Sequence, residues 1–335
     1  MAISPVNIGN NSGTRGVPTD MDNALEIYSG LVLTAFDRKN MGLGMVKVKT
    51  IESGSSYPFP VIARSLDNSD VVRTHTPGTE ISTNEIPVKE RIINIDTLEY
   101  YSLAINKFEE KILHFETRSE LGKQAGEALA ETIDKDVFSQ VLLASQTSGT
   151  IGGAVMQPDG SEVNNDVIDS GSDAEAKGDA ILEALYEAST LMTEKNVSGT
   201  KYFVTTPRNY NYLVQSQKAV NGDYTSGNGG IDSGTVLKVA GIDIMWSNHL
   251  PVTDTIANDT ANGVETGVDV GGTDKKFQGL LFTEDCIGVL KLMDITSESN
   301  YLPKQLDTLL TSYYSYGMGV LNPGASCVIT GGTQA

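Results

Sequence analysis

Apolar residues recur at every fourth position between residues 118 and 145 and predict one long helix. Side chains spaced by four lie on one face of a helix, so this stripe is its buried side. Thr117 and Glu120 have the spacing of a capping box, which predicts that the helix starts there. A helix of roughly 28 residues exceeds the average of about 12 residues and is typical of a structural spine. The stripe consists of Leu121, Ala125, Leu129, Ile133, Val137 and Val141.

Residues 46–95 follow a different pattern and predict long strands. Their apolar groups lie at 46–48, 59–62 and 88–95 and are separated by turn-forming residues, as in a hairpin or an extended loop. The segment holds as many basic as acidic side chains, although the whole chain has a formal net charge of −19. Either this balance is accidental, or it lets the segment approach an acidic neighbour without repulsion.

The rest of the chain predicts short helices and strands in mixed order. Residues 1–23 are polar and indicate a flexible arm. Residues 146–179 are acidic and glycine-rich but lack the ligand spacing of a calcium loop, so a solvated loop or hairpin is expected. Further helices are predicted at 29–40, 107–115, 181–192 and from Pro207, and further strands at 201–206, 236–247, 279–283, 287–294 and in the tail after 309.

Composition argues against several classes of function. Acidic residues number 43 and basic residues 24, so a phosphate-neutralising surface for nucleic acid is not expected. No stretch approaches the ~20 apolar residues of a membrane span, and the first residues lack the apolar core of a secretory signal. The 3 histidines leave little material for a metal site. We therefore expect no membrane, no metal and no cofactor.

Motifs for catalysis are missing as well. The chain has no GxSxG, HExxH, CxxC or Walker sequence, and Gly317-Met318-Gly319 lacks the helix pattern that follows in a dinucleotide site. Cys286 lies beside Asp285, whose charge opposes thiolate formation. Both Cys286 and Cys327 are therefore predicted to be buried structural residues. The tyrosines near 313–316 are expected in the core or at an interface. An enzyme is not expected.

Several segments, taken in order, resemble one family. From about residue 29 to 329 the chain is similar to the major capsid proteins of T-seven-like short-tailed bacteriophages (podoviruses). No persuasive match covers 1–28, 146–179 or 252–276. The resemblance rests on SGLVLTAF (29–36), FPVIAR (59–64), HTPGTEI (75–81), KFEEKILHFETRSELGKQAGEALA (107–130), YFVTTPRNYNYL (202–213), VAGIDIMWSNHLP (239–251) and YSYGMGVLNPGA (314–325).

The resemblance implies an α+β chain with the Hong-Kong-97-type capsid fold. It implies an N-terminal arm at 1–45 and an extended β-hairpin loop at 46–95. The peripheral domain would comprise 96–179 and 311–335, with the long spine helix at about 118–145. A mixed α/β axial domain would occupy 180–310.

The same resemblance implies a major capsid protein that self-assembles as hexamers and pentamers into an icosahedral shell enclosing double-stranded DNA. Its precursor would be assembled in the host cytoplasm with a scaffolding protein and a portal, and would expand on packaging. The triangulation number is expected to be seven, a cementing protein is an optional addition, and DNA is enclosed without sequence-specific binding. The mature location is the virion.

Four residues of the extended loop are predicted to contact neighbouring subunits: Tyr57, Phe59, Arg64 and Arg73. For Phe59 the alternative is packing within its own subunit. Two other functions stay open. One is a cellular nanocompartment shell of the same fold, and the other is a soluble acidic enzyme without a recognisable site.

Overall fold

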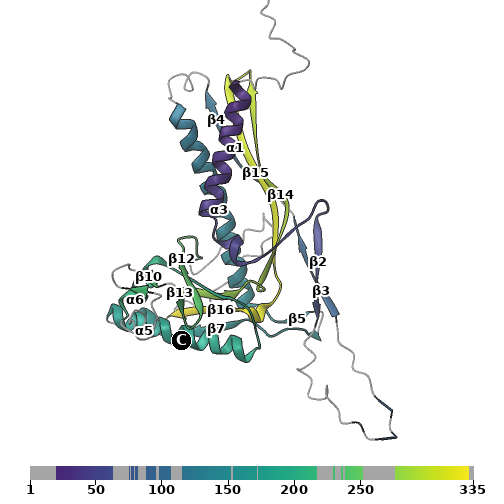
Figure 1. The fold of residues 1–335 in the computed structure, drawn as a ribbon, viewed down its shortest axis with the longest axis vertical. Helices are drawn as coiled ribbons and strands as arrows, with labels where there is room; N and C mark the ends of the chain where they lie inside the picture. Colours follow the sequence, from purple (N-terminus) through teal and green to yellow (C-terminus); the bar gives the residue numbers. More distant parts are fainter. Residues whose placement is uncertain are drawn as a thin grey trace, which may run out of the picture.

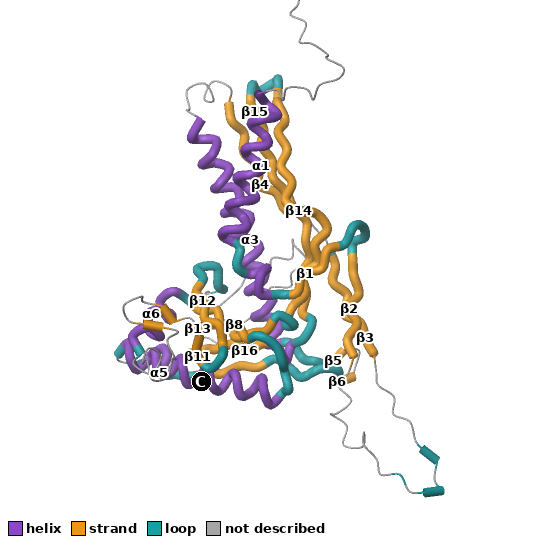
Figure 2. Tube along the Cα trace, in the orientation of Figure 1, coloured by secondary structure: helices purple, strands orange, loops and turns teal. Residues whose placement is uncertain are grey.

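The computed structural model describes residues 20–62, 75, 77–78, 80–81, 88–95, 98–106, 115–151, 154–171, 173–216, 229–230, 235–236, 238–251 and 276–331. Within these residues the chain forms two units and a separate hairpin (Figure 1, Figure 2). The upper unit stacks two helices on a 4-stranded sheet, and the lower unit combines a 6-stranded sheet with helices.

The two helices of the upper unit are α1 (Asp20–Lys39) and α3 (Phe115–Gln146), which pack side by side (Figure 1). Ala125, Leu129 and Val137 of the predicted stripe are buried. A Cβ added at Gly126 would lie 2.4 Å from the carbonyl oxygen of Val32 in α1. Because no side chain fits that space, glycine at this position lets the two helices approach closely.

The 4-stranded sheet has the order β1-β14-β15-β4 and supports both helices. β14 runs parallel to β1, and the β14–β15 and β15–β4 pairs are antiparallel. The register of β14 against β15 shifts twice between Lys291 and Thr296. Such irregularities bend a strand locally. The four strands are β1 (Lys47–Thr50), β4 (Glu99–Asn106), β14 (Ile287–Leu302) and β15 (Asp307–Val320).

The lower unit is built on a 6-stranded sheet of order β11-β12-β8-β13-β16-β7. α5 packs Ala184 and Leu185 against a core that includes Phe203 and Ile329 of the sheet. Its elements are β7 (Ser161–Asn164), α4 (Val167–Ser170), α5 (Ala174–Glu194), β8 (Lys201–Thr205), α6 (Pro207–Gln215), β11 (Lys238–Val239), β12 (Ile242–Trp246), β13 (Lys276–Thr283) and β16 (Ser326–Gly331).

The hairpin consists of β2 (Ser56–Ile62) and β3 (Val88–Asn94), which pair antiparallel. It stands on the side of β14 that faces away from α1 and α3 (Figure 1). The remaining short elements are η1 (Gly42–Met45), β5 (Thr150–Ile151), β6 (Ala154–Val155), β9 (Gly229–Gly230), β10 (Thr235–Val236) and η4 (Pro323–Ala325).

The predicted helices that fall within the described residues are present, with corrections at their starts. α3 begins at Phe115, so Thr117 lies inside the helix and the predicted cap is wrong. α1 begins at Asp20, so it is longer than the predicted 29–40 and includes residues assigned to a flexible arm. The start of α6 at Pro207 is confirmed, and the Thr206 hydroxyl accepts a hydrogen bond from the Asn209 amide as its N-cap. The helix predicted at 107–115 lies outside the described residues, apart from Phe115.

The sheets group the strands differently from the predicted domains, whose boundaries stay a prediction. A boundary at residue 310 falls within β15, which pairs with β14 in the upper unit. β16 was assigned to the peripheral domain but lies between β13 and β7 in the lower sheet. In residues 146–179 the structure has the β5–β6 hairpin, β7, α4 and the start of α5.

Candidate subunit-contact surface

The β2–β3 hairpin has an inner face that packs on its own chain. Tyr57, Phe59 and Val61 alternate with more exposed residues along β2. The rings of Tyr57 and Phe59 meet edge to face at a centroid distance of 5.0 Å and pack against a cluster that contains Ile93 and Leu290. Lys49 Nζ lies 5.7 Å from the Tyr57 ring centroid. The apolar side chains of this face therefore find most of their packing partners within one subunit.

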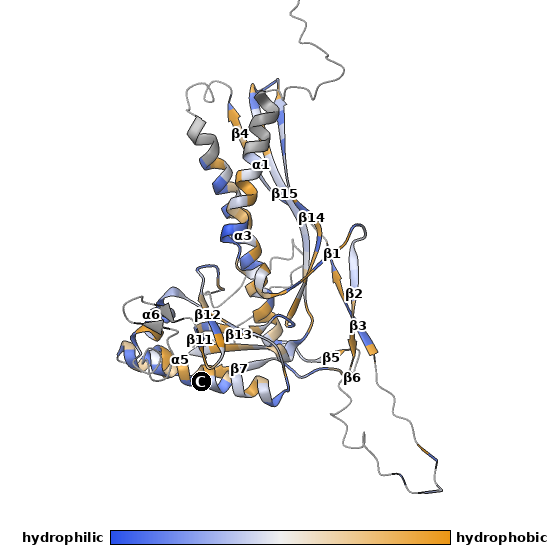
Figure 3. Cartoon of the chain, viewed as in Figure 1, coloured by the Kyte–Doolittle hydropathy of each residue, from blue (hydrophilic) through white to orange (hydrophobic). Residues whose placement is uncertain are grey.

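The opposite face of the hairpin is exposed to solvent. Pro58, Pro60 and Ile62 of β2 stand opposite Ile92, Glu90 and Val88 of β3 in the ladder. Ile62 is 65% exposed, Val88 58% and Ile92 64%. Figure 3 shows apolar segments in both strands. An exposed apolar face of this kind is a candidate interaction surface. We call these six residues the outer face of the hairpin.

The predicted contact residues fall partly on the other side. Tyr57 and Phe59 lie on the inner face, half-buried by their own chain, which is the alternative stated for Phe59. Arg64 and Arg73 lie outside the described residues, so their contact role stays a prediction. Sequence reasoning missed the outer face because both sides of β2 carry apolar or aromatic residues. One side holds Tyr57 and Phe59, and the other holds Pro58, Pro60 and Ile62. The alternation alone does not say which side turns outward.

Two glycines of β15 hold the base of the hairpin close to the sheet. A Cβ added at Gly317 would lie 2.1 Å from the carbonyl oxygen of Asn94, and one at Gly319 would lie 2.9 Å from Cγ1 of Ile93. These two glycines therefore permit β3 to cross β15 at close range. The Gly-x-Gly sequence thus has a packing role.

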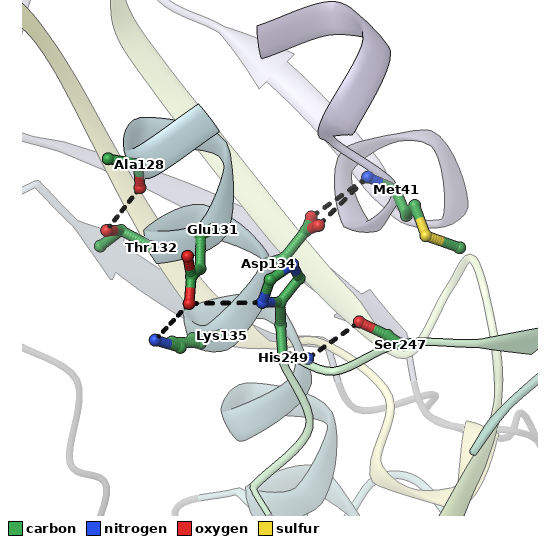
Figure 4. Close-up of polar contacts among 8 residues, drawn as sticks. All are labelled: Met41, Ala128, Glu131, Thr132, Asp134, Lys135, Ser247 and His249. Atoms are coloured by element: carbon green, nitrogen blue, oxygen red, sulfur yellow. Dashed lines mark hydrogen bonds and ion pairs between the residues drawn. The ribbon is translucent and has the colours of Figure 1, made fainter. Parts of the chain in front are cut away.

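A buried carboxylate fixes the chain just before the hairpin (Figure 4). Asp134 of α3 is fully buried, and its Oδ1 accepts hydrogen bonds from the amides of Gly42 at 2.8 Å and Met41 at 3.2 Å. Burial raises the pKa of Asp134, while these two amides and the nearby His249 lower it in part. The carboxylate thus ties the corner between α1 and η1 to the middle of α3, and the corner leads directly into β1.

The same turn of α3 also contacts the segment after β12. His249 Nδ1 lies 3.6 Å from Oε1 of Glu131, and the same oxygen lies 2.9 Å from Lys135 Nζ. The hydrogen bond from Lys135 is the largest influence lowering the pKa of Glu131. The His249 amide in turn donates to the Ser247 hydroxyl at 3.1 Å. Figure 4 shows these contacts around α3, which also packs against β13, β16 and β7 of the lower unit.

A pair of tyrosines joins β15 to α3 and β4. Tyr314 and Tyr316 are stacked with their ring centroids 5.0 Å apart. The Tyr314 hydroxyl donates to Glu99 Oε2 at 2.6 Å, and the Tyr316 hydroxyl donates to Asp136. Burial is the main reason that the pKa values of both phenols are raised. These side chains belong to the core, one of the two locations expected for tyrosines of the tail.

The cysteines offer no reactive thiol. Cys286 and Cys327 are fully buried, and burial raises the pKa of each to about 12, so both are protonated at neutral pH. Their prediction as buried structural residues is confirmed. Among the described residues no cluster of three or more His, Cys, Asp and Glu side chains could hold a metal. No described helix is both long and apolar enough to cross a membrane.

Comparison with known proteins gives the family. Residues 69–330 match the family model described as Gp10A-like major capsid protein, and this span covers most of the chain. The chain belongs to this family. It is therefore a major capsid protein, a structural component of the virion capsid.

Relatives by sequence are capsid proteins of phages. The major capsid protein of Enterobacteria phage T3 is 27% identical, and the match covers 96% of this chain and 95% of the relative. The major capsid protein of Escherichia phage T7 is 26% identical, with 95% of both chains covered. Minor capsid proteins of both phages match at similar identity. The resemblance stated from the sequence is confirmed.

Solved capsid structures share the fold. The capsid of cyanophage P-SCSP1u superposes with a TM-score of 0.73 at 30% identity, covering 86% of this chain and 87% of that chain. The mature capsid of bacteriophage PhiM1 gives 0.71 at 18% identity, with 88% of both chains covered. The predicted Hong-Kong-97-type fold is thereby confirmed. The virus-like particle of Pyrococcus furiosus, at 16% identity and a TM-score of 0.52, shares the fold alone. The family therefore favours a phage capsid over a nanocompartment.

Proposed function

We propose that this capsid protein self-assembles as hexamers and pentamers into an icosahedral shell around double-stranded DNA, with the hairpin as a lateral contact between subunits. The observation that carries the proposal is the bare outer face of the hairpin, whose three large aliphatic residues are more than half exposed. An isolated two-stranded arm gains nothing by presenting such a face to water. In a shell the next subunit covers it.

The charge of the chain supports the enclosure of DNA without binding to its sequence. The net charge of −19 gives a wall that repels phosphates, so the genome can slide past it during filling. The charge-balanced arm, by contrast, can lie on an acidic neighbour without repulsion. A role as a structural component without catalysis agrees with the family, which is one of capsid proteins.

The finer features follow from the resemblance and belong to the same proposal. They are a scaffolded precursor with a portal, assembly in the host cytoplasm, expansion on packaging, a lattice of triangulation number seven and the optional cementing protein. Arg64 and Arg73 remain proposed contacts in the part of the extended loop outside the described residues. The domain division stays part of the proposal, although β7 and β16 of the peripheral segments lie in the lower sheet and β14 of the axial segment lies in the upper one.

One charge placed on the outer face tests the contact. The chain with Ile92→Asp is expected to stay as unassembled subunits, because a buried carboxylate at the contact lacks a partner. Ser53→Asp adds the same charge to an exposed turn of the same arm and is expected to assemble like the parent. Analytical ultracentrifugation and electron microscopy measure the outcome.

The possible results separate the two parts of the proposal. If Ile92→Asp forms closed particles as readily as the parent, the hairpin is not the contact. If the parent chain under assembly conditions remains a monomer of 35.8 kDa, the shell proposal itself is wrong. Equal thermal unfolding of the dissociated subunits shows that Ile92→Asp acts on assembly and not on folding.

A further inference from the structure

The inner face of the β2–β3 hairpin carries a guanidinium group that lacks partners. Arg91 of β3 stands opposite Phe59 of β2 in the ladder and is partly buried. Its Nε and Nη2 atoms are buried and have no hydrogen-bond partner among the described residues. Burial lowers the pKa of Arg91, yet an arginine stays charged at neutral pH. A buried charged donor without an acceptor costs free energy.

The two atoms without partners belong to one edge of the guanidinium. Nε–H and Nη2–H point in the same direction and together form a fork. Such a fork donates two parallel hydrogen bonds to two oxygens of one oxyanion. The missing partner is therefore a single group with two acceptor oxygens, rather than two unrelated acceptors.

Two lysines add positive charge to the same face. Lys89 lies two residues before Arg91, so both side chains point inward, while Glu90 between them points to the outer face. Lys49 of β1 places its Nζ 5.7 Å from the ring centroid of Tyr57, which is also on the inner face. Among the described residues no carboxylate forms an ion pair with these three cations. The chain as a whole has a net charge of −19, so this local excess of positive charge runs against its composition.

This set of donors fits a phosphate group better than a carboxylate. A phosphate monoester carries a charge of about −1.5 to −2 at pH 7 and has three strong acceptor oxygens. It can therefore occupy the fork of Arg91 and still attract Lys49 and Lys89. A carboxylate has a single charge and would fill the fork alone. Arginine as a fork and lysine as a point charge are both common in phosphate recognition.

The hairpin can open to admit such a ligand without loss of a strand ladder. β2 and β3 form a 2-stranded sheet of their own, and neither pairs with another described strand. The inner face meets the body of the chain through side chains, in the cluster that contains Ile93 and Leu290. Moving the arm therefore changes side-chain packing and leaves the backbone pairing of both sheets intact.

We propose that the inner face of the hairpin binds a phosphate group, with the Nε–Nη2 edge of Arg91 on two of its oxygens and Lys49 and Lys89 adding charge. The bound group braces the arm against β1. All three cations come from one chain. The site is therefore independent of the outer face and of the proposed shell function.

Thermal unfolding of the full-length subunit, dissociated from particles, tests the site. A ligand that binds only the folded chain raises the unfolding temperature. With saturating inorganic phosphate we expect a rise of about 3–6 °C relative to sodium chloride at the same ionic strength, which screens charges without filling the fork. Glycerol phosphate is titrated separately, because a phosphate group can come from a free anion or from an ester. A saturable response to either supports the site and identifies the source.

Variants of Arg91 separate the fork from the charge. Arg91→Met should be at least as stable as the parent without phosphate, because it removes donors that have no acceptor, and it should not respond to phosphate. Arg91→Lys keeps the charge without the fork, so the phosphate concentration for half of the effect should rise about tenfold. The control is Arg208→Gln, which removes an exposed guanidinium from α6 and should respond like the parent.

Three results would overturn the site. The first is a parent whose unfolding temperature rises no more with either phosphate compound than with sodium chloride. The second is an equal rise in Arg91→Met. The third is an Arg91→Met variant that is much less stable than the parent without phosphate, because Arg91 would then be satisfied within the chain. None of these measurements depends on assembly, so the shell function stands or falls separately.

Discussion

The spine helix α3 and the β2–β3 hairpin differ in where their apolar side chains go. In α3 the apolar stripe is buried against α1, the sheet and η4, apart from Leu121, which is partly buried. In the hairpin one face is buried and the other, with Ile62 and Ile92, is exposed. The comparison teaches that the helix satisfies its apolar side chains within one subunit, whereas the arm leaves apolar side chains exposed for the neighbour proposed above. Substitutions in the two regions should therefore affect different measurements.

The largest effect on folding is expected in α3. Phe138 is fully buried in the core. Phe138→Ala therefore leaves a cavity and should lower the free energy of unfolding by about 3–5 kcal/mol. Denaturant unfolding of dissociated subunits measures the loss. Tyr186→Ala on α5, where the side chain is 55% exposed, is the control and should change stability by no more than about 0.5 kcal/mol. Equal losses in both variants contradict the prediction.

Removing the buried carboxylate should have a smaller effect. Asp134→Ala leaves the amides of Met41 and Gly42 without their acceptor, at a cost of about 1–3 kcal/mol. Asp134→Asn keeps an acceptor oxygen without the charge and should be the milder change. Denaturant unfolding of dissociated subunits compares the two, and an Asn variant that loses as much as the Ala variant speaks against the hydrogen-bond account.

The pH dependence of the same position has a defined sign. Because burial raises the pKa of Asp134 in the folded chain, the protonated carboxyl favours folding. This contribution is complete below the unfolded pKa of about 3.9 and is lost as pH rises through the folded pKa. Relative to Asp134→Asn, the parent should therefore become less stable from acid toward neutral pH. Unfolding curves of both proteins over that range test it; a constant difference would refute the role of the charge.

Two glycines of the upper unit give effects of opposite sign. Gly126→Ala in α3 places a methyl group against the backbone of α1 and should destabilise the subunit by about 1–3 kcal/mol. Gly30→Ala in α1 meets nothing within 4 Å and should stabilise it by about 0.5–1 kcal/mol through helix propensity. Thermal unfolding of the two variants decides. A loss of stability in Gly30→Ala would contradict the open space around this position.

The smallest effect on folding is expected at the outer face. Ile92→Ser changes a side chain that is 64% exposed, so the free energy of unfolding should move by no more than about 0.5 kcal/mol. Particle yield should fall nonetheless, because the contact loses apolar area. The measurement is a pair of numbers from one preparation, the unfolding midpoint and the fraction assembled. A large change in the unfolding midpoint with a normal particle yield would show that Ile92 contributes to folding and not to the contact between subunits.

The sequence predicted elements well where one period dominates. The apolar stripe of α3 repeats every four residues over many turns, so the helix was predictable. Its start was not predictable, because Thr117 has the spacing of a cap yet lies inside the helix. Ala130, Asp134 and Phe138 form a second buried row with the same four-residue spacing. A carboxylate within an apolar row is the sequence signal that could have identified Asp134, but the prediction considered only the first stripe. The partners of Asp134 at Met41 and Gly42 are far away in sequence, and only the folded chain brings them together.

The contact surface was predicted only as a segment. The strands of the hairpin follow from their apolar groups, but both faces carry apolar residues, so periodicity does not select the outer one. The docking of β3 on β15 depends on the space above Gly317 and Gly319, which composition does not reveal. The place of β16 inside the lower sheet was likewise hidden, because strand order is set by pairing between distant segments.

The position of β16 has a consequence for synthesis. It is the last described strand to leave the ribosome, yet it lies between β13 and β7. Until it emerges, β7 has no ladder partner among the described strands and β13 lacks one of its two neighbours. A nascent chain that stops before Ser326 therefore lacks an interior strand of this sheet. The lower sheet can therefore be completed only after almost the whole described chain has been synthesised.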